Sequence, residues 1–220
     1  MMDIKIDSDL KAILPEIRLG VLVCDVVVTE SSELLRLEMH SEFQTFRDKV
    51  TTADISKLAN VFKARSCYRA LGKDPTKYRV SSEKLMRRIT RGEGVDFINN
   101  IVDLSNLVSV KSMNSVGTYD YDQIKGSVLF TRGRSGETYL NIGGQEMNLE
   151  NLLILKDTQK PFGSTTADSK RTSVNETTQK IVMNIISLDA SDPLEDHLDY
   201  AEQLLIQYGA SQRIEKRIVK

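Results

Sequence analysis

The sequence predicts an α+β fold in which a mixed, largely antiparallel sheet is packed with helices. Two observations lead to this class: strands and amphipathic helices alternate in the first half of the chain, and strand hairpins dominate the second half. At 220 residues the chain can bury roughly 70% of its unfolded surface, so we expect a single domain over residues 1–220. No long apolar run and no leader-like start are present, which favours a cytoplasmic protein without a membrane segment.

The first third of the chain contains two strand patterns and two helix patterns. The strands are expected at residues 3–7 and 17–29, and the helices at residues 31–50 and 52–72. The second strand is almost entirely apolar and β-branched, as in a strand that is buried on both faces. The second helix would turn Ile55, Leu58 and Phe62 toward the core.

A basic segment follows, in which residues 63–91 carry ten lysines and arginines against two acidic residues, a net charge of +8. The helix expected at residues 82–91 places its cations on one stripe, which consists of Lys84, Arg87, Arg88 and Arg91. Such a stripe is typical of a surface that contacts RNA phosphates. A solvated face balanced by carboxylates elsewhere in the fold explains it equally well.

The helix expected to begin near residue 97 has a wide apolar face and a short polar row of Asn99, Asp103 and Asn106. Polar side chains in such a helix must cap neighbouring backbone or line a cavity. A turn-rich crossing is expected over residues 112–122, where Gly117 permits close approach of the backbone. A strand over residues 124–132 follows it.

The remainder of the chain consists of hairpin strands and one helix. Strands are expected at residues 138–142, 145–149, 152–156 and 180–187, and Gly143-Gly144 marks a two-residue turn. Asp192 should cap the last helix, which ends at Gly209. The final eight residues fit either an edge strand or a mobile tail.

Two features of this half indicate a polar site. Residues 160–174 form a loop rich in hydroxyl groups, with Asp168 as its carboxylate, which suits a loop around a polar ligand as well as a plain surface loop. Asn184 lies in an otherwise apolar strand, so protein or ligand must satisfy its amide. The chain has two cysteines and no phosphate-binding glycine loop or metal motif, so we expect neither metal nor cofactor.

A longer pattern joins VDLSN at residues 102–106, YDYDQIKG at residues 119–126, Arg132, and Gly136-Glu137. This pattern resembles the B3/B4 domain of the bacterial phenylalanyl-tRNA synthetase beta subunit. VNETT at residues 174–178, followed by a strand, resembles the next signature of that family. The resemblance covers residues 79–187, with residues 1–78 and 188–220 as flanking elements of one B3/B4-like domain.

The resemblance implies an editing pocket that hydrolyses the ester of a mischarged aminoacyl-tRNA by placing one water, without a covalent nucleophile. If this chain has the same activity, we expect catalytic roles for Asp168, Thr172 and Asn184, with Asp168, a carboxylate in a loop that is glycine-rich in the family, orienting the water or the ammonium group. Substrate contacts are implied for Asn106, Gly117, Ser164, Ser169 and Arg171. Two positions depart from the family pattern, because Gly117 replaces a histidine and Asn184 replaces a glutamate.

Three functions fit these features: a trans-acting aminoacyl-tRNA deacylase, a non-catalytic tRNA or RNA binder, and a binder of an amino-acid-like small molecule. The expected partner is tRNA, bound through Lys84, Arg87, Arg88 and Arg91, with an amino acid or aminoacyl ester in the pocket. Binding to DNA and aminoacylation by this chain alone are not expected. The amino acid, the tRNA and the oligomeric state stay open.

Overall fold

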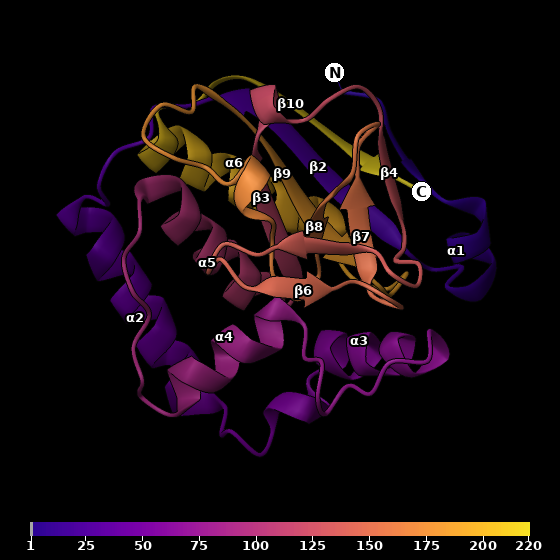
Figure 1. Cartoon of the computed structure of the whole chain (residues 1–220). Coiled ribbons are helices and arrows are strands. Elements are labelled where there is room, and N and C mark those ends of the chain that lie inside the picture. Colours follow the sequence, from indigo (N-terminus) through magenta and orange to yellow (C-terminus); the bar gives the residue numbers. More distant parts are fainter. Residues whose placement is uncertain (1) are drawn as a thin grey trace.

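The computed structural model describes residues 2–220 and contains two stacked four-stranded sheets and a small hairpin (Figure 1). The first sheet has the order β1-β4-β7-β8, made of Ile4–Ile6, Val128–Arg132, Leu153–Lys156 and Pro161–Ser164. The second has the order β10-β2-β9-β3, made of Gln212–Val219, Arg18–Asp25, Lys180–Ser187 and Ser115–Asp120. The hairpin pairs β5 (Thr138–Leu140) with β6 (Glu146–Asn148).

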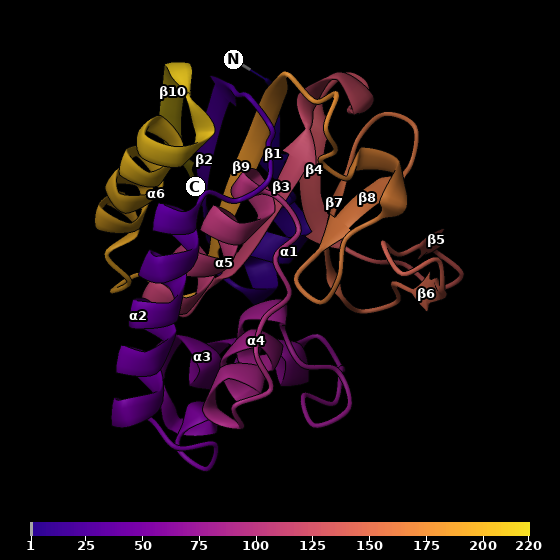
Figure 2. The same cartoon turned by 90° about the vertical axis from the view of Figure 1, so that its left-hand side faces the viewer.

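The helices are arranged around these sheets, as Figure 2 shows. They are α1 (Ser8–Ile13), α2 (Glu33–Lys49), α3 (Ala59–Ala70), α4 (Ser81–Thr90), α5 (Asn100–Ser112) and α6 (Leu194–Gly209). Three short 3-10 helices connect them, at Ile55–Lys57 (η1), Tyr121–Gln123 (η2) and Lys170–Thr172 (η3). Among the strand pairs of residues 2–220, β1–β4 is parallel and the pairs within the second sheet are antiparallel, which confirms the predicted mixed α+β fold. None of the helices in this range is long and apolar enough to span a bilayer.

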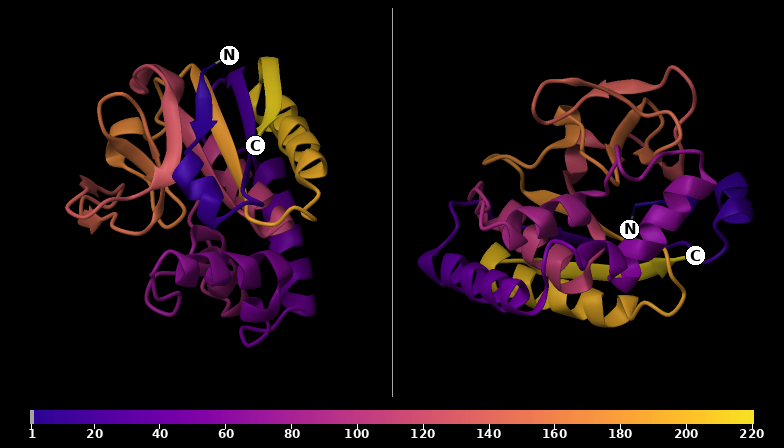
Figure 3. Two further views of the ribbon diagram at one scale, coloured as in Figure 1. Left: turned by 90° about the vertical axis from the view of Figure 1, so that its right-hand side faces the viewer. Right: turned by 90° about the horizontal axis from the view of Figure 1, so that it is seen from below.

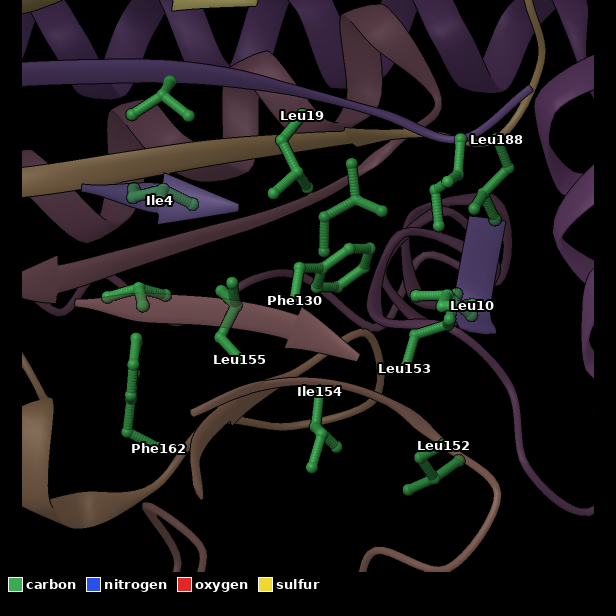
Figure 4. Packing of buried hydrophobic residues seen from close by; sticks show 14 of the residues in the cluster. Ile4, Leu10, Leu19, Phe130, Leu152, Leu153, Ile154, Leu155, Phe162 and Leu188 are labelled. Atoms are coloured by element: carbon green, nitrogen blue, oxygen red, sulfur yellow. The ribbon is translucent and has the colours of Figure 1, made fainter. Parts of the chain in front are cut away.

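The main core lies between the two sheets. Leu19 from the second sheet packs toward Phe130, Leu155 and Phe162 from the first (Figure 4). The opposite face of the second sheet is covered by α5 and α6 through a separate apolar cluster. Because side chains alternate along a strand, β9 contributes to both cores, with Val182 in the first and Met183 in the second.

Helices α2, α3 and α4 gather at one end of the sheets (Figure 3). Here the prediction of one helix over residues 52–72 was wrong, because Leu58 has extended backbone angles (φ −57°, ψ 134°) and separates η1 from α3. The interruption rotates the second segment, so Phe62 is 58% exposed while Val61 and Tyr68 are buried. The predicted apolar face therefore holds for η1 and fails for α3.

Most elements of the second half lie where the sequence predicts them. Strand β9 occupies Lys180–Ser187 as expected, and the final residues form β10, which pairs with β2. The turn-rich crossing expected over residues 112–122 is instead strand β3, because Met113 adopts a left-handed backbone (φ 57°) and ends α5 at once. Side chains alternate along β3, so that Val116 faces α5 while Tyr119 faces the first sheet.

Asp192 joins four separate segments instead of capping α6. Its carboxylate accepts hydrogen bonds from Asn60 Nδ2 (2.9 Å), Asn114 Nδ2 (2.9 Å) and His197 Nε2 (3.1 Å). Its backbone carbonyl accepts from Arg18 at 2.8 Å. Burial by itself would raise the pKa of Asp192, but the hydrogen bonds outweigh it and lower the pKa below its ordinary value. His197 of α6 is part of this network.

We expect Asp192→Ala to lower the free energy of unfolding by about 3 kcal/mol, because it leaves buried amide donors unpaired. Chemical denaturation of the variant measures this loss. Asp189→Ala is the matched control, since its side chain bonds only within the exposed turn to Ser191, and should change stability by less than about 1 kcal/mol. Equal losses in both variants would contradict a special role for Asp192.

Candidate functional site

The polar loop of residues 160–174 is folded tightly against the rest of the molecule. Its first part is β8, and the chain then turns so that Ser169 N donates to Phe162 O at 2.9 Å. Ser164 Oγ closes the turn by donating to Ala167 O at 2.7 Å. Ser164 and Ser169 therefore hold the loop in shape, and each is buried.

Three neighbouring elements anchor this loop. From α3, the Tyr68 hydroxyl lies 2.5 Å from Thr165 Oγ1 and 2.8 Å from Thr166 Oγ1. From α4, Lys84 Nζ donates to Thr166 O at 3.2 Å. From the β5–β6 hairpin, Tyr139 donates its hydroxyl to Ala167 O at 2.5 Å. The loop is thus an ordered wall between the sheets, the basic helices and the hairpin.

The space that this wall encloses is filled by the side chain of Tyr119 from β3. The Tyr119 hydroxyl lies 2.2 Å from the position that a Cβ atom would take at Gly117, and 2.2 Å from the same position at Gly163. No side chain larger than hydrogen fits at either residue while the ring stays there. The ring stands edge-on to Phe162, with centroids 5.0 Å apart.

The side chain of Asp168 accepts a hydrogen bond from the Tyr119 hydroxyl. Tyr119 donates to Asp168 Oδ1 at 2.7 Å, and the same oxygen accepts from Ser164 N at 3.2 Å. Desolvation raises the pKa of Asp168 to about 6, against the opposing effect of these hydrogen bonds. Burial, and then the neighbouring Asp168 charge, raise the pKa of Tyr119 well above its ordinary value. At neutral pH the site therefore pairs a carboxylate with a neutral phenol.

Asn184 lies on β9 directly opposite Gly117, so its side chain faces the same inter-sheet space. It is 1% exposed, and within residues 2–220 its Oδ1 atom has no hydrogen-bond partner. A buried acceptor without a donor costs about 1–3 kcal/mol. Among the predicted site residues, Asn184 Oδ1 and Arg171 Nε are buried without a partner in residues 2–220, and of these two Asn184 lies opposite Gly117.

The other predicted site residues divide into two groups. Thr172 is fully buried within the loop and donates to Phe162 O at 3.4 Å. Arg171 points away from the inter-sheet space, because its guanidinium pairs with Asp157 at 3.0 Å. Asn106 is on α5, which covers the opposite face of the second sheet. The structure thus brings together Gly117, Ser164, Asp168, Ser169, Thr172 and Asn184, and separates Asn106 and Arg171 from them.

The predicted basic stripe on α4 is present, but acidic neighbours pair with its arginines. Arg88 lies 3.4 Å from Asp96, and Arg91 lies 2.9 Å from Glu93, in exposed pairs. Lys84 donates to the polar loop of residues 160–174, called the site loop below, and desolvation lowers the pKa of Lys84. The stripe is therefore less cationic than the helix sequence suggests.

Arg87 belongs to a buried cluster that the sequence analysis did not identify. The Glu83 side chain is fully buried, and its Oε1 atom lies within 4 Å of three guanidinium groups: Arg65 (2.7 Å), Arg87 (2.9 Å) and Arg79 (3.6 Å). A carboxylate shared in this way fixes α3 against α4. The only sequence signal was an acidic residue isolated within a long basic run.

Tyr119 was also missed as a site residue. It was placed in the family pattern but given no role, although Gly117 two residues earlier on the same strand face leaves room for its ring. No group of three or more histidine, cysteine or acidic side chains in residues 2–220 is arranged to hold a metal ion.

Known proteins with similar sequences are beta subunits of phenylalanine–tRNA ligase. The subunit from Symbiobacterium thermophilum is 37% identical over 73 residues, which are 32% of this chain and 8% of that protein. The subunit from Protochlamydia amoebophila is 30% identical over 125 residues, which are 56% of this chain and 15% of that protein. The matches therefore span a small fraction of these relatives.

A solved N-terminal fragment of the phenylalanyl-tRNA synthetase beta subunit from Pyrococcus horikoshii has the same fold. It matches with a TM-score of 0.52 and 12% sequence identity, over all of this chain and 54% of the fragment. The family model described as the B3/4 domain matches residues 63–218, a span that begins within α3 and includes α4, the site loop and β9. The resemblance noted in the sequence is confirmed, and the chain belongs to the B3/4 domain family.

Proposed function

We propose that this chain binds tRNA, with the 3′ end of the RNA directed toward the inter-sheet site. The observation that carries the proposal is the direct contact between α4 and the site loop, where Lys84 Nζ donates to Thr166 O. A phosphate backbone that follows the basic helices would therefore reach the wall of the site. The relatives named as tRNA ligase subunits support the same partner.

Arg88 of α4 and Arg91 directly after this helix remain available to RNA despite their ion pairs. Arg88 and Arg91 have side chains that are 43% and 52% exposed, and exposed pairs of this kind are worth no more than about 1 kcal/mol. A phosphate can replace the carboxylate at little cost. Arg87 is different, because its guanidinium belongs to the Glu83 cluster and serves the fold.

Hydrolysis of an aminoacyl ester is the second candidate function, and Asp168 favours it. A carboxylate with a pKa of about 6 is a competent general base near neutral pH. In this reaction Asp168 takes a proton from water while the oxygen of the water adds to the ester carbonyl. The bond to the ribose oxygen then breaks, and Asp168 returns the proton to that oxygen. The products are free amino acid and uncharged tRNA.

Replacing both exposed arginines, Arg88→Gln with Arg91→Gln, should weaken tRNA binding at least tenfold. The slope of log affinity against log salt concentration should fall by about 1.5, since each lost phosphate contact contributes about 0.7–0.9. Fluorescence anisotropy of labelled tRNA at several salt concentrations measures both quantities. Lys5→Gln, an exposed cation on β1, is the control and should leave the slope unchanged. An unchanged slope in the double variant would rule out this face as the RNA surface.

If the chain is a deacylase, release of amino acid from a panel of charged tRNAs should rise about tenfold per pH unit below pH 6 and level off above it, because only ionised Asp168 accepts a proton. Asp168→Asn should reduce the rate at least 100-fold while tRNA binding is retained. Equal release by the native chain and this variant across the panel would leave tRNA binding as the function.

Asp168 should also make stability depend on pH. Its pKa is higher in the folded chain than in the unfolded chain, so its contribution is fully present below about pH 4 and is lost as pH rises through about 6. The loss is about 3 kcal/mol for a difference of this size. Urea denaturation between pH 4.5 and 7.5 measures it, and Asp168→Asn should remove the decline.

A further inference from the structure

We propose that Tyr119 is a removable internal occupant of the inter-sheet site, and that a ligand enters by taking the place of its side chain. The inference rests on the proposed function only for the location of the site. It adds a feature particular to this chain, which is a site that the protein's own side chain keeps closed.

The shape of the site supports this role for Tyr119. Gly117 and Gly163 lie on strands of different sheets, yet a Cβ atom at either one would lie 2.2 Å from the same hydroxyl. Two facing residues without side chains thus leave a slot between the sheets, and the Tyr119 ring fills it. The ring is 1% exposed, so a ligand of similar size has no room while the ring remains.

The polar groups of the slot indicate what a ligand must bring. Asp168 accepts one hydrogen bond from the Tyr119 hydroxyl, whereas Asn184 Oδ1, opposite Gly117, accepts none. The resident tyrosine therefore satisfies one of two buried acceptors. A small molecule with a phenol-sized apolar body and hydroxyl or ammonium donors could satisfy both, which would compensate for displacing the ring.

The position of β3 gives the ring a way out. Strand β3 is at the edge of its sheet and pairs only with β9 there, apart from an isolated bridge between Tyr119 and Ser173. To leave past this edge, the side chain has to displace only the segment at Ser173, which belongs to no named strand. Its contacts with Phe162 and Asp168 are what a ligand has to replace.

Removing the side chain and supplying its free equivalent tests the proposal. In Tyr119→Ala, 10 mM p-cresol should occupy the vacated slot and raise the midpoint of thermal unfolding by roughly 3–5 °C if the dissociation constant is near 1 mM. Toluene, which cannot donate to Asp168, should raise it by less than half as much. The native chain should not respond to either compound, because its tethered ring competes at a high effective concentration.

Phe130→Ala is the matched control, since Phe130 is fully buried in the same core but has no polar partner. In Phe130→Ala, p-cresol and toluene should raise the midpoint of thermal unfolding equally, because the cavity left by the ring has no polar group to pair with the phenol. Equal responses of Tyr119→Ala to the two compounds, or a response of the native chain as large as that of the variant, would overturn the proposal. If Tyr119→Ala does not fold alone, recovery of folded protein with p-cresol but not toluene supports it, and recovery with neither contradicts it.

A second set of variants tests the fit of the ring against Gly117. Gly117→Ala should lower the unfolding midpoint by several degrees in the native background, because the new methyl group meets the Tyr119 ring. In the Tyr119→Ala background the same change should have little effect, giving a non-additive cycle. Additive effects would mean that the ring does not occupy the slot. None of these measurements involves RNA, so a failure of tRNA binding would leave their outcome unaffected.

Discussion

The architecture depends on one constraint, which is that strand β9 is buried on both of its faces. Val182 and Ile186 pack between the two sheets, while Met183 and Ile185 pack under α5 and α6. A strand in this position must be apolar throughout, because no side of it reaches water. Asn184 breaks that rule in the middle of the strand, and its amide points into the space between the sheets. This unpaired buried acceptor lies in the inter-sheet space where we propose that a ligand binds.

The shape of the site depends on how the Tyr119 ring fills the space left by two glycines. Gly117 has no side chain, and the space beside it is taken by Tyr119, two residues later on the same strand face. Gly163 on the facing sheet likewise has no side chain, and the ring occupies that space too. These three residues form one packing unit, since a change of size at any of them alters the space available to the others. Chemistry at Asp168 is therefore tied to the conformation of Tyr119, which holds the carboxylate through its hydroxyl.

Sequence patterns predicted the strands and most helices because periodicity and turn residues are local signals, as in β9 and the Gly143-Gly144 hairpin. They failed at Leu58 and Met113, where a single residue leaves helical geometry although neither is a glycine or proline, the residues that mark helix ends in a sequence. Asp168, Ser164 and Asn184 were identified as candidates from their residue types. Their meeting with Tyr119, the separation of Arg171 and Asn106 from them, and the burial of Glu83 all depend on contacts between distant segments, which no local pattern encodes.

The β5–β6 hairpin gives the site a mechanical connection to the surface. Ile142 N donates to the backbone carbonyl of Asp168 at 3.0 Å, and Asn141 forms a bridge with Ser169, so the hairpin is bonded directly to the backbone of the site loop. Leu140 and Ile142 stand 57% and 61% exposed on the outside of the hairpin. A partner that binds these two exposed side chains would contact the segment that is hydrogen-bonded to the backbone of Asp168. It would therefore influence the position of the residue that accepts the Tyr119 hydrogen bond without contacting Tyr119 itself.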